Sequence, residues 1–480
     1  MRYNLFFTLF LFTLVSCSKF GIISRGPASS SSEISVLGDL EGNIDRFNDF
    51  IQKSDALFLN SSGELDLVAG KRFVFLGDVM DRGPGSLRIM NDLVNLKEKY
   101  PENVTLILGN RDINKLRIMS LMDGSLTRPV PEIVIPWHKK TIEESFNIKI
   151  PDNLSAQEFQ EFVKEYDNPL LRFKSFLAGM NAPLAFEFRR EELEILYPEK
   201  AIDDHFVFAS FLQDYDESGI LRRYLKNGEL GKIIDGNIFV HGAVTNENFG
   251  FIPGRAIRET DPEKWIDGLN DFARDEIDDW FSDSRKGQNL IDYHAPRPGS
   301  IKNLNSVVYA RFSDDAGNPI APGRKLIQKL RRYGIYRVVV GHTPTGDYPI
   351  IVRKPNFEVL LTDSSFSSVN KASKITIKGK DVLVETEISK SRDLVIKSNV
   401  EEVMNPLGMK TSDGYRVIGK FSDSDNVMIL KVEGKGRRFS TKYVEESALN
   451  IANKGLVEVF EQRVNSSCRQ IMQGFLGRKL

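Results

Sequence analysis

Five polar residues of metal-binding type each follow a short apolar run and stand beside a glycine. Carboxylate, amide and imidazole groups of this kind bind divalent metals in proteins. A single Gly-Asp after an apolar run is usually only a turn. Because the same arrangement recurs along the chain, we expect one site built from all five residues. They are Asp39, Asp78, Asn110, His241 and His342.

The apolar runs before these residues are predicted to be strands buried on both faces of a sheet, because they are continuous and rich in β-branched residues. They span 34–37, 73–76, 104–108, 238–240 and 338–340. Helices are predicted after two of them, at 44–53 and 85–100. Ligands of open α/β sheets bind where the carboxyl ends of the strands meet. The sequence therefore predicts an α/β fold with the five polar residues at one crevice.

Three further regions surround this pattern. A charged, helix-leaning insertion covers about 113–236, and a second, acidic one covers about 261–286. Each is interpreted as a wall or lid of a substrate pocket, with structural scaffolding as the alternative. Alternating apolar and polar residues predict a small β-rich module at 396–480, after a main domain at 33–395.

The ordered motifs resemble those of the calcineurin-like metallophosphoesterases, nearest the branch of the Ser/Thr phosphoprotein phosphatases and the symmetrical dinucleoside tetraphosphatases. The resemblance covers about 34–363 and implies an αββα sandwich of two sheets between helices. It rests on Gly38-Asp39-Leu40-Glu41-Gly42-Asn43, Gly77-Asp78-Val79-Met80-Asp81-Arg82-Gly83, Gly109-Asn110-Arg111-Asp112, His241-Gly242 and Gly341-His342-Thr343-Pro344.

The resemblance also implies two divalent metal ions that acidify a bridging water and bind the phosphate. Asp78 would bridge the ions, and Asp39 would bind the first. The second would be held by Asn110, His241 and His342. Mn is the favoured metal, with Fe, Zn, Ni and Mg as alternatives.

Two arginines are candidates for binding the phosphate of a substrate, together with Asn110. Arg82 follows Asp81 and precedes a turn, and a guanidinium can bind two phosphate oxygens at once. Arg311 follows an aromatic segment and resembles the family's second phosphate-binding arginine.

Two positions depart from the family pattern. Glu41 stands where the family has a histidine; it either binds the first metal through oxygen or points away and leaves that site weak. Arg111 replaces the histidine that protonates the leaving alkoxide, which the aspartate at the position of Asp81 orients. Arginine keeps its protons at any working pH, so Arg111 would instead stabilise phosphoryl charge or pair with Asp81.

The predicted function is a metal-dependent phosphatase biased toward aryl phosphates such as phosphotyrosine or toward phosphoanhydrides, since these need a general acid least. Its substrate would be a phosphorylated small molecule or a phosphoprotein. One alternative is an impaired pseudophosphatase that binds a phosphorylated ligand or a protein partner. Another places the function in the C-terminal module. A net charge of −1 gives no reason to expect nucleic-acid binding.

The N-terminus predicts export and lipidation. Arg2 precedes an apolar run at 5–15, too short to span a bilayer comfortably, and residues 14–17 resemble the lipobox of bacterial lipoproteins. Residues 1–17 would then be a signal peptide, Cys17 the lipidated membrane anchor, and 18–32 a flexible tether in the bacterial cell envelope. An ordinary secretory signal is the alternative. With Cys17 acylated, the other cysteine, Cys468, has no intramolecular partner.

Overall fold

The structure is a computed structural model. It describes residues 32–119, 143, 148–165, 168–283, 286–297, 300, 302–364, 370–389, 392–402, 405–433 and 438–452. The predicted signal peptide, Cys17 and all of the tether but its last residue lie outside the described residues, and these assignments stay predictions. Within the described part, no helix is both long and apolar enough to cross a membrane.

Parallel strands form one end of a ten-stranded sheet. Its first strand, β1 (Glu33–Leu37), pairs with β4 (Arg72–Phe75), which pairs with β5 (Val104–Ile107) and then β6 (Gly228–Glu229). The three longer strands are almost wholly buried, as their continuous apolar sequences predict.

A second sheet of five strands has the order β10-β11-β9-β8-β7. Its centre is parallel, with β8 (Asn237–Val240), β9 (Arg337–Val340) and β11 (Phe357–Leu361) side by side. Antiparallel strands close both edges: β7 (Gly231–Ile234) and β10 (Ile350–Lys354). All five predicted strands are therefore confirmed, three in one sheet and two in the other.

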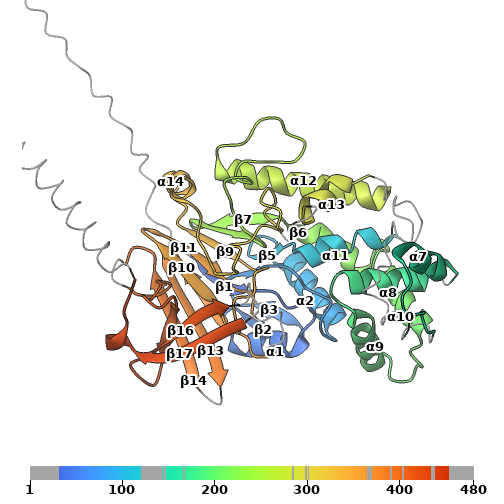
Figure 1. Cartoon of the computed structure of the whole chain (residues 1–480), viewed down its shortest axis with the longest axis horizontal. Helices are drawn as coiled ribbons and strands as arrows, with labels where there is room; N and C mark the ends of the chain where they lie inside the picture. The colour runs from blue at the N-terminus through green and yellow to red at the C-terminus, as the bar shows by residue number, and fades with distance from the viewer. Residues whose placement is uncertain are drawn as a thin grey trace, which may run out of the picture. The chain divides into compact units, whose positions relative to one another are not determined.

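Helices lie on both outer sides of the strands. The predicted helices are α1 (Ile44–Lys53) and α2 (Ser86–Lys99), and α2 packs on β5. On the other side, α12 (Pro262–Ser282) packs on β7 and contacts α13 (Gln288–His294). Figure 1 shows α12 above β7 at the top of the view, and α1 near the bottom. The α/β sandwich predicted from the sequence is confirmed.

The first insertion is helical where it is described. Its helices are α7 (Ala156–Lys164), α8 (Pro169–Gly179), α9 (Ala185–Leu196), α10 (Asp204–Gln213) and α11 (Ile220–Asn227). Helix α11 packs on α2, which connects the insertion to the sheet. Two smaller elements complete the fold, the hairpin of β2 (Leu57–Leu59) with β3 (Leu65–Leu67) and α14 (Arg324–Arg332).

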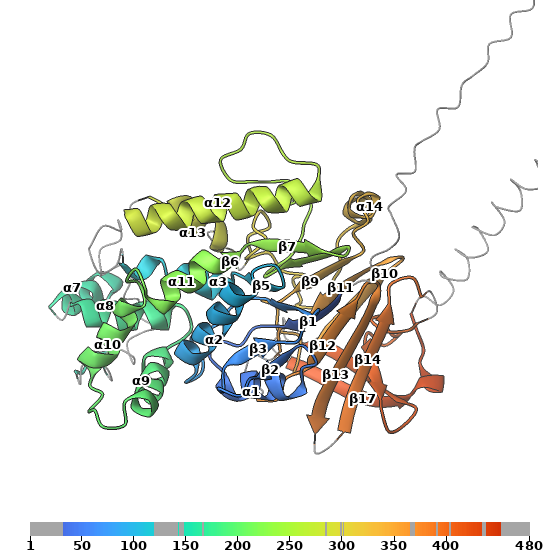
Figure 2. The same cartoon turned by 180° about the vertical axis from the view of Figure 1, so that it is seen from behind.

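The C-terminal strands continue the ten-stranded sheet. An antiparallel series pairs onto β1 in the order β12 (Lys374–Lys378), β13 (Asp381–Ser389), β14 (Arg392–Asn399), β15 (Arg416–Phe421), β16 (Asn426–Glu433) and β17 (Arg438–Glu445). Figure 2 shows β12, β13 and β14 extending the sheet beyond β1. The residues expected to form a β-rich module therefore share a sheet with the predicted main domain, and the boundary at 395/396 stays a prediction.

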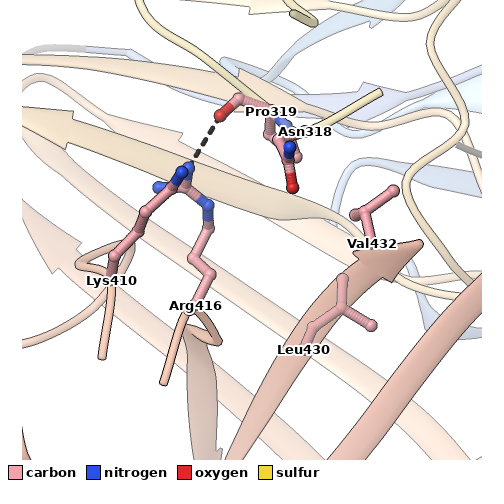
Figure 3. A pocket seen from close by; sticks show the side chains of 7 residues that line it. Asn318, Pro319, Lys410, Arg416, Leu430 and Val432 are labelled. Atoms are coloured by element: carbon pink, nitrogen blue, oxygen red, sulfur yellow. Dashed lines mark hydrogen bonds between the residues drawn. The ribbon is translucent and has the colours of Figure 1, made fainter. Parts of the chain in front are cut away.

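A buried arginine connects these C-terminal strands to the loop after Arg311. Arg416 on β15 donates to the carbonyl oxygen of Pro319 at 2.7 Å, and Figure 3 shows this bond at a small pocket. The same side chain donates to the carbonyl oxygen of Gly408. The guanidinium thus satisfies two buried carbonyl groups from different segments.

A second buried arginine joins the two sheets at the amino-terminal end of β9. Arg337 and Glu358 are fully buried, and their closest atoms are 2.6 Å apart. Arg337 also donates to the carbonyl oxygens of Gly379 and Lys380, in the turn between β12 and β13. On the other carboxylate oxygen, Glu358 accepts from Ser398 of β14.

We predict that Arg337→Met lowers the free energy of unfolding by about 3–5 kcal/mol, because Glu358 becomes a buried charge without its partner. Urea unfolding followed by circular dichroism measures this loss. Arg274→Met is the matched control, since the Arg274–Asp271 pair is exposed and contributes at most about 1 kcal/mol. Equal losses in the two variants would contradict the assignment.

Candidate metal centre

Three side chains converge where the carboxyl ends of strands from the two sheets meet. Asp78 follows β4, His241 follows β8 and His342 follows β9. Each offers one ligand atom, these atoms lie within 4.8 Å of one another, and all three residues are buried. Asn110 joins them, with its Oδ1 3.2 Å from Nε2 of His241. The structure thus brings four of the five strand-end residues together.

Hydrogen bonds orient the imidazole of His241, whereas one nitrogen of the His342 ring has no partner among the described residues. Nδ1 of His241 lies 2.7 Å from the carbonyl oxygen of Leu76, which fixes the proton on Nδ1 in the neutral ring and turns Nε2 toward Asp78 at 3.5 Å. Nε2 of His342 is buried and has no hydrogen-bond partner among the described residues. Burial lowers the pKa of His342 well below its usual value, so the ring is neutral and one of its two nitrogens carries a lone pair.

Asp78 and His241 form a strongly interacting pair. Burial raises the pKa of Asp78, but the charges of His241 and Arg111 and the hydrogen bonds from both residues together outweigh burial and lower it to about 2. Burial lowers the pKa of His241, but the charges of Asp78 and Asp39 raise it to about 10. A positive charge at this position is therefore strongly favoured.

The turns that present these side chains have an uncommon backbone conformation. Asp78 has a φ of 55° and His342 a φ of 60°, values that L residues rarely adopt and that cost about 1–3 kcal/mol each. Hydrogen bonds hold both: Arg111 N–H donates to Oδ1 of Asp78 at 2.8 Å, and His342 N–H donates to Oδ2 of Asp39 at 3.1 Å.

The glycines of the motifs are required by close approach. A Cβ on Gly109 would lie 2.1 Å from Oδ1 of Asp78, and one on Gly341 would lie 2.1 Å from Oδ1 of Asp39. This is why a glycine precedes Asn110 and His342. Without a side chain at these two positions, the backbone can lie against the carboxylates of Asp78 and Asp39.

Asp39 lies next to this cluster, together with a carboxylate that sequence reasoning missed. Asp363 follows β11, is buried, and its Oδ1 has no hydrogen-bond partner among the described residues. Burial and the neighbouring charge of Asp363 raise the pKa of Asp39 well above its usual range. Burial raises the pKa of Asp363 to about 6, against the lowering effect of Arg46. Asp363 also follows an apolar strand, but no glycine precedes it.

Glu41 faces arginines. Its Oε1 lies 2.6 Å from Nε of Arg111, and its Oε2 accepts from Arg82 at 2.9 Å. Nη1 of Arg111 donates to Asp81 at 3.1 Å, which confirms the contact considered from the sequence. Lys115, which the sequence did not single out, lies 2.7 Å from Asp81 and is 1% exposed. Lys115 directly follows α3 (Asn110–Asn114) and lies four residues after Arg111. This helical spacing is the one feature of the sequence that places Lys115 on the same side as Arg111.

Arg311 reaches the same region from the other side. Its Nη1 donates to the carbonyl oxygen of His342 at 2.7 Å, and its guanidinium lies over the ring of Tyr309. The segment before it was expected to resemble a strand, but residues 307–309 form a turn. Arg311 is half-buried, so part of its surface faces solvent.

Asp112, the last residue of the third motif, fixes the loops around Asp78. It accepts hydrogen bonds from the N–H groups of Asp78 and Gly109 on Oδ2 and of Val79 on Oδ1, at 2.7–2.9 Å. It is fully buried. The carboxylate therefore connects the loop after β4 to the loop after β5.

We predict that Asp112→Ala lowers the free energy of unfolding by about 3 kcal/mol or more, because three buried N–H groups lose their acceptor. Asp315→Ala serves as a control at a fully exposed aspartate and should change stability by no more than about 0.5 kcal/mol. Urea unfolding compares the two. A loss below about 1 kcal/mol in the Asp112 variant would show that water replaces the carboxylate.

Comparisons with known proteins agree with this geometry. The family model described as calcineurin-like phosphoesterase matches residues 33–346. The chain is 46% identical over 57 residues to serine/threonine-protein phosphatase sitA of Aspergillus fumigatus, covering 12% of this chain and 15% of that protein. It is 31% identical over 86 residues to the serine/threonine-protein phosphatase 6 catalytic subunit of Drosophila melanogaster, covering 18% and 25%. These matches thus span only a small part of each relative.

Among solved structures, a cold-active protein-tyrosine phosphatase of a psychrophilic Shewanella species is 15% identical, with a TM-score of 0.40 over 74% of this chain and 77% of that one. A metallophosphoesterase from Sphaerobacter thermophilus is 10% identical, with a TM-score of 0.28 over 75% and 89%. Since the family model spans well over half of the sequence, the chain belongs to the calcineurin-like phosphoesterase family.

Proposed function

We propose that this protein is a metal-dependent hydrolase of phosphate esters. The observation that carries the proposal is the buried group of Asp78, His241 and His342, whose ligand atoms lie within 4.8 Å of one another in a member of this family. The unpartnered Nε2 of His342 is the kind of atom that a metal ion would satisfy. Mixed imidazole and carboxylate donors suit Mn, Fe, Zn or Ni.

Asp78, His241, His342 and Asn110 would hold a divalent ion. When bound, such an ion acidifies water to give a nucleophile and neutralises phosphoryl charge. Nδ1 of His241 would stay on the Leu76 carbonyl and keep Nε2 directed at the ion. Because the pKa of His241 is raised to about 10, binding would release a proton from this ring.

Two arginines would bind the phosphoryl group. Arg82 is held by Glu41, and Arg311 is held by the carbonyl oxygen of His342. Arg82 is 19% exposed at its side chain. A guanidinium carries five N–H groups in a planar fork, a geometry that suits two phosphate oxygens.

Arg111 would act as a fixed charge and not as an acid. Burial lowers the pKa of Arg111, but Glu41 and Asp81 outweigh it and raise the pKa above its usual value. A proton donor for the leaving group is thus missing at this position, which slows esters of poor leaving groups by about 10²–10⁴. Aryl phosphates and phosphoanhydrides depend on it least, so we propose them as the substrate class.

The same contact between Arg111 and Glu41 is the observation that favours a second candidate. If the ion pair prevents turnover, the protein would be a pseudophosphatase that binds a phosphorylated ligand or protein partner. Hydrolysis assays therefore decide between the two.

We predict that divalent metal stabilises the protein, because the ion neutralises buried carboxylates. At a free metal concentration of about 100 Kd the gain in unfolding free energy is about 2.7 kcal/mol. Thermal unfolding with Mn²⁺ and with EDTA measures this gain. Asp78→Asn should lose most of the response, and an unchanged response in that variant would contradict the assigned ligand.

We predict that Mn²⁺-loaded protein hydrolyses p-nitrophenyl phosphate much faster than an alkyl phosphate such as phosphoserine. Arg111→His should raise the alkyl rate relative to the aryl rate by up to about 10²–10⁴, since it supplies a proton donor. Asp78→Asn should abolish both activities. Equal aryl and alkyl rates in the unmodified protein would contradict the proposed bias, and no turnover of either would favour the pseudophosphatase.

A further inference from the structure

The carboxylates of Glu41 and Asp81 are already neutralised by the chain itself. Arg82 and Arg111 contact Glu41, and Arg111 and Lys115 contact Asp81. With the contact between Arg111 and Asp78, these ion pairs among the described residues set three cations against three carboxylates. The charges of Glu41 and Asp81 are therefore already balanced before any metal binds.

Arg111 occupies the position between two expected metal ligands. Its Nε lies 2.6 Å from Oε1 of Glu41 and 3.7 Å from Oδ2 of Asp78. These are the oxygen atoms that a first metal ion would need to share. Arg111 is held there on its far side by Asp81, and its side chain is only 9% exposed. A divalent ion between Glu41 and Asp78 would have to displace or approach a buried guanidinium, and like charges in a poorly solvated site repel strongly.

The opposite side of Asp78 has a different balance. Asp39, Asp78 and Asp363 bring three buried carboxylates near His241 and His342. The opposing positive groups are Arg46 for Asp363 and the ring of His241 for Asp39 and Asp78. Arg46 itself donates to the carbonyl oxygen of Ser364 at 3.3 Å. Nε2 of His342 and Oδ1 of Asp363 have no hydrogen-bond partner among the described residues. This side therefore offers negative charge and unused donor atoms to a cation.

We propose, on the basis of the proposed function, that the two metal positions of this protein are unequal. One divalent ion binds tightly at Asp78, His241 and His342. At the other position, the Arg111 guanidinium takes the place of the first ion and links Glu41 to Asp78. The chain thus departs from the two-ion arrangement that its family resemblance implies.

Metal content tests the inference directly. The protein is incubated with excess Mn²⁺ or Zn²⁺, desalted, and analysed by mass spectrometry for metal per chain. We expect about one retained ion in the unmodified protein, in contrast to the pair used by two-metal sites. Asp78→Asn should retain none. About two retained ions in the unmodified protein would overturn the inference.

A pair of double variants tests the role of Arg111 and Glu41. Glu41→His with Arg111→His removes the ion pair and supplies imidazoles, and should raise retention to about two ions per chain. The matched control, Glu41→Gln with Arg111→Met, removes the ion pair without supplying a strong ligand and should stay near one. Circular dichroism establishes that each variant folds. A histidine variant that folds and still retains one ion would count against the inference.

Electron paramagnetic resonance of the unmodified protein with Mn²⁺ needs no variant. We expect the hyperfine pattern of an isolated ion even when Mn²⁺ is in excess. The pattern of an exchange-coupled pair would overturn the inference while leaving phosphate-ester hydrolysis standing. Absence of any retained metal together with absence of aryl phosphate turnover would instead overturn the proposed function, and this inference with it.

Discussion

Repulsion among buried carboxylates is the constraint on which the rest of this site depends. Asp39, Asp78, Asp112 and Asp363 are all buried, and their pKa values are mutually perturbed. Such a group is stable only if each charge has a specific partner. Asp112 has three backbone N–H groups, Asp78 has His241 and the N–H of Arg111, and Asp363 has the charge of Arg46. The strand ends, the tight turns and the glycines follow from the need to bring these partners within reach.

The two sheets are joined at both ends of β9. The carboxyl end contributes to the metal site, and the amino end carries a separate network of buried contacts. At the carboxyl end of β9, His342 faces Asp39 of the other sheet through its N–H group. At the amino end of the same strand, Arg337 binds Glu358 and the turn between β12 and β13. These contacts of Arg337 connect the two sheets at the end of β9 that lies opposite His342. The contacts of Arg337 thus help to stabilise a fold in which Asp78 and His342 keep an unfavourable backbone conformation.

The sequence revealed the parts of the site that carry a local signal and missed the parts that do not. Continuous apolar runs, each followed by a polar residue beside a glycine, predicted β1, β4, β5, β8 and β9 and the residues after them. Burial of a strand and a close turn both restrict residue type. Asp363 and Lys115 were missed, since their significance comes from partners brought near by the fold. The C-terminal strands were expected from alternation, but the series joins β1 through β12, and that pairing connects segments more than 300 residues apart. Periodicity within a segment holds no information about such a partner.

The two departures from the family pattern are best understood as one change. Where the resemblance implies two histidines, this chain has Glu41 and Arg111, and their side chains contact each other at 2.6 Å. Two neutral imidazoles and an ion pair carry the same net charge, so the exchange leaves the electrostatic balance of the site nearly unaltered. What changes is the chemistry, because a titratable ring that can give up a proton is replaced by a guanidinium that keeps its protons. Lys115 then compensates Asp81, whose usual imidazole partner is absent. A substitution at either position alone would remove ion pairs from a buried network whose members share partners. This is reason to treat Glu41, Asp81, Arg111 and Lys115 as a single coupled unit.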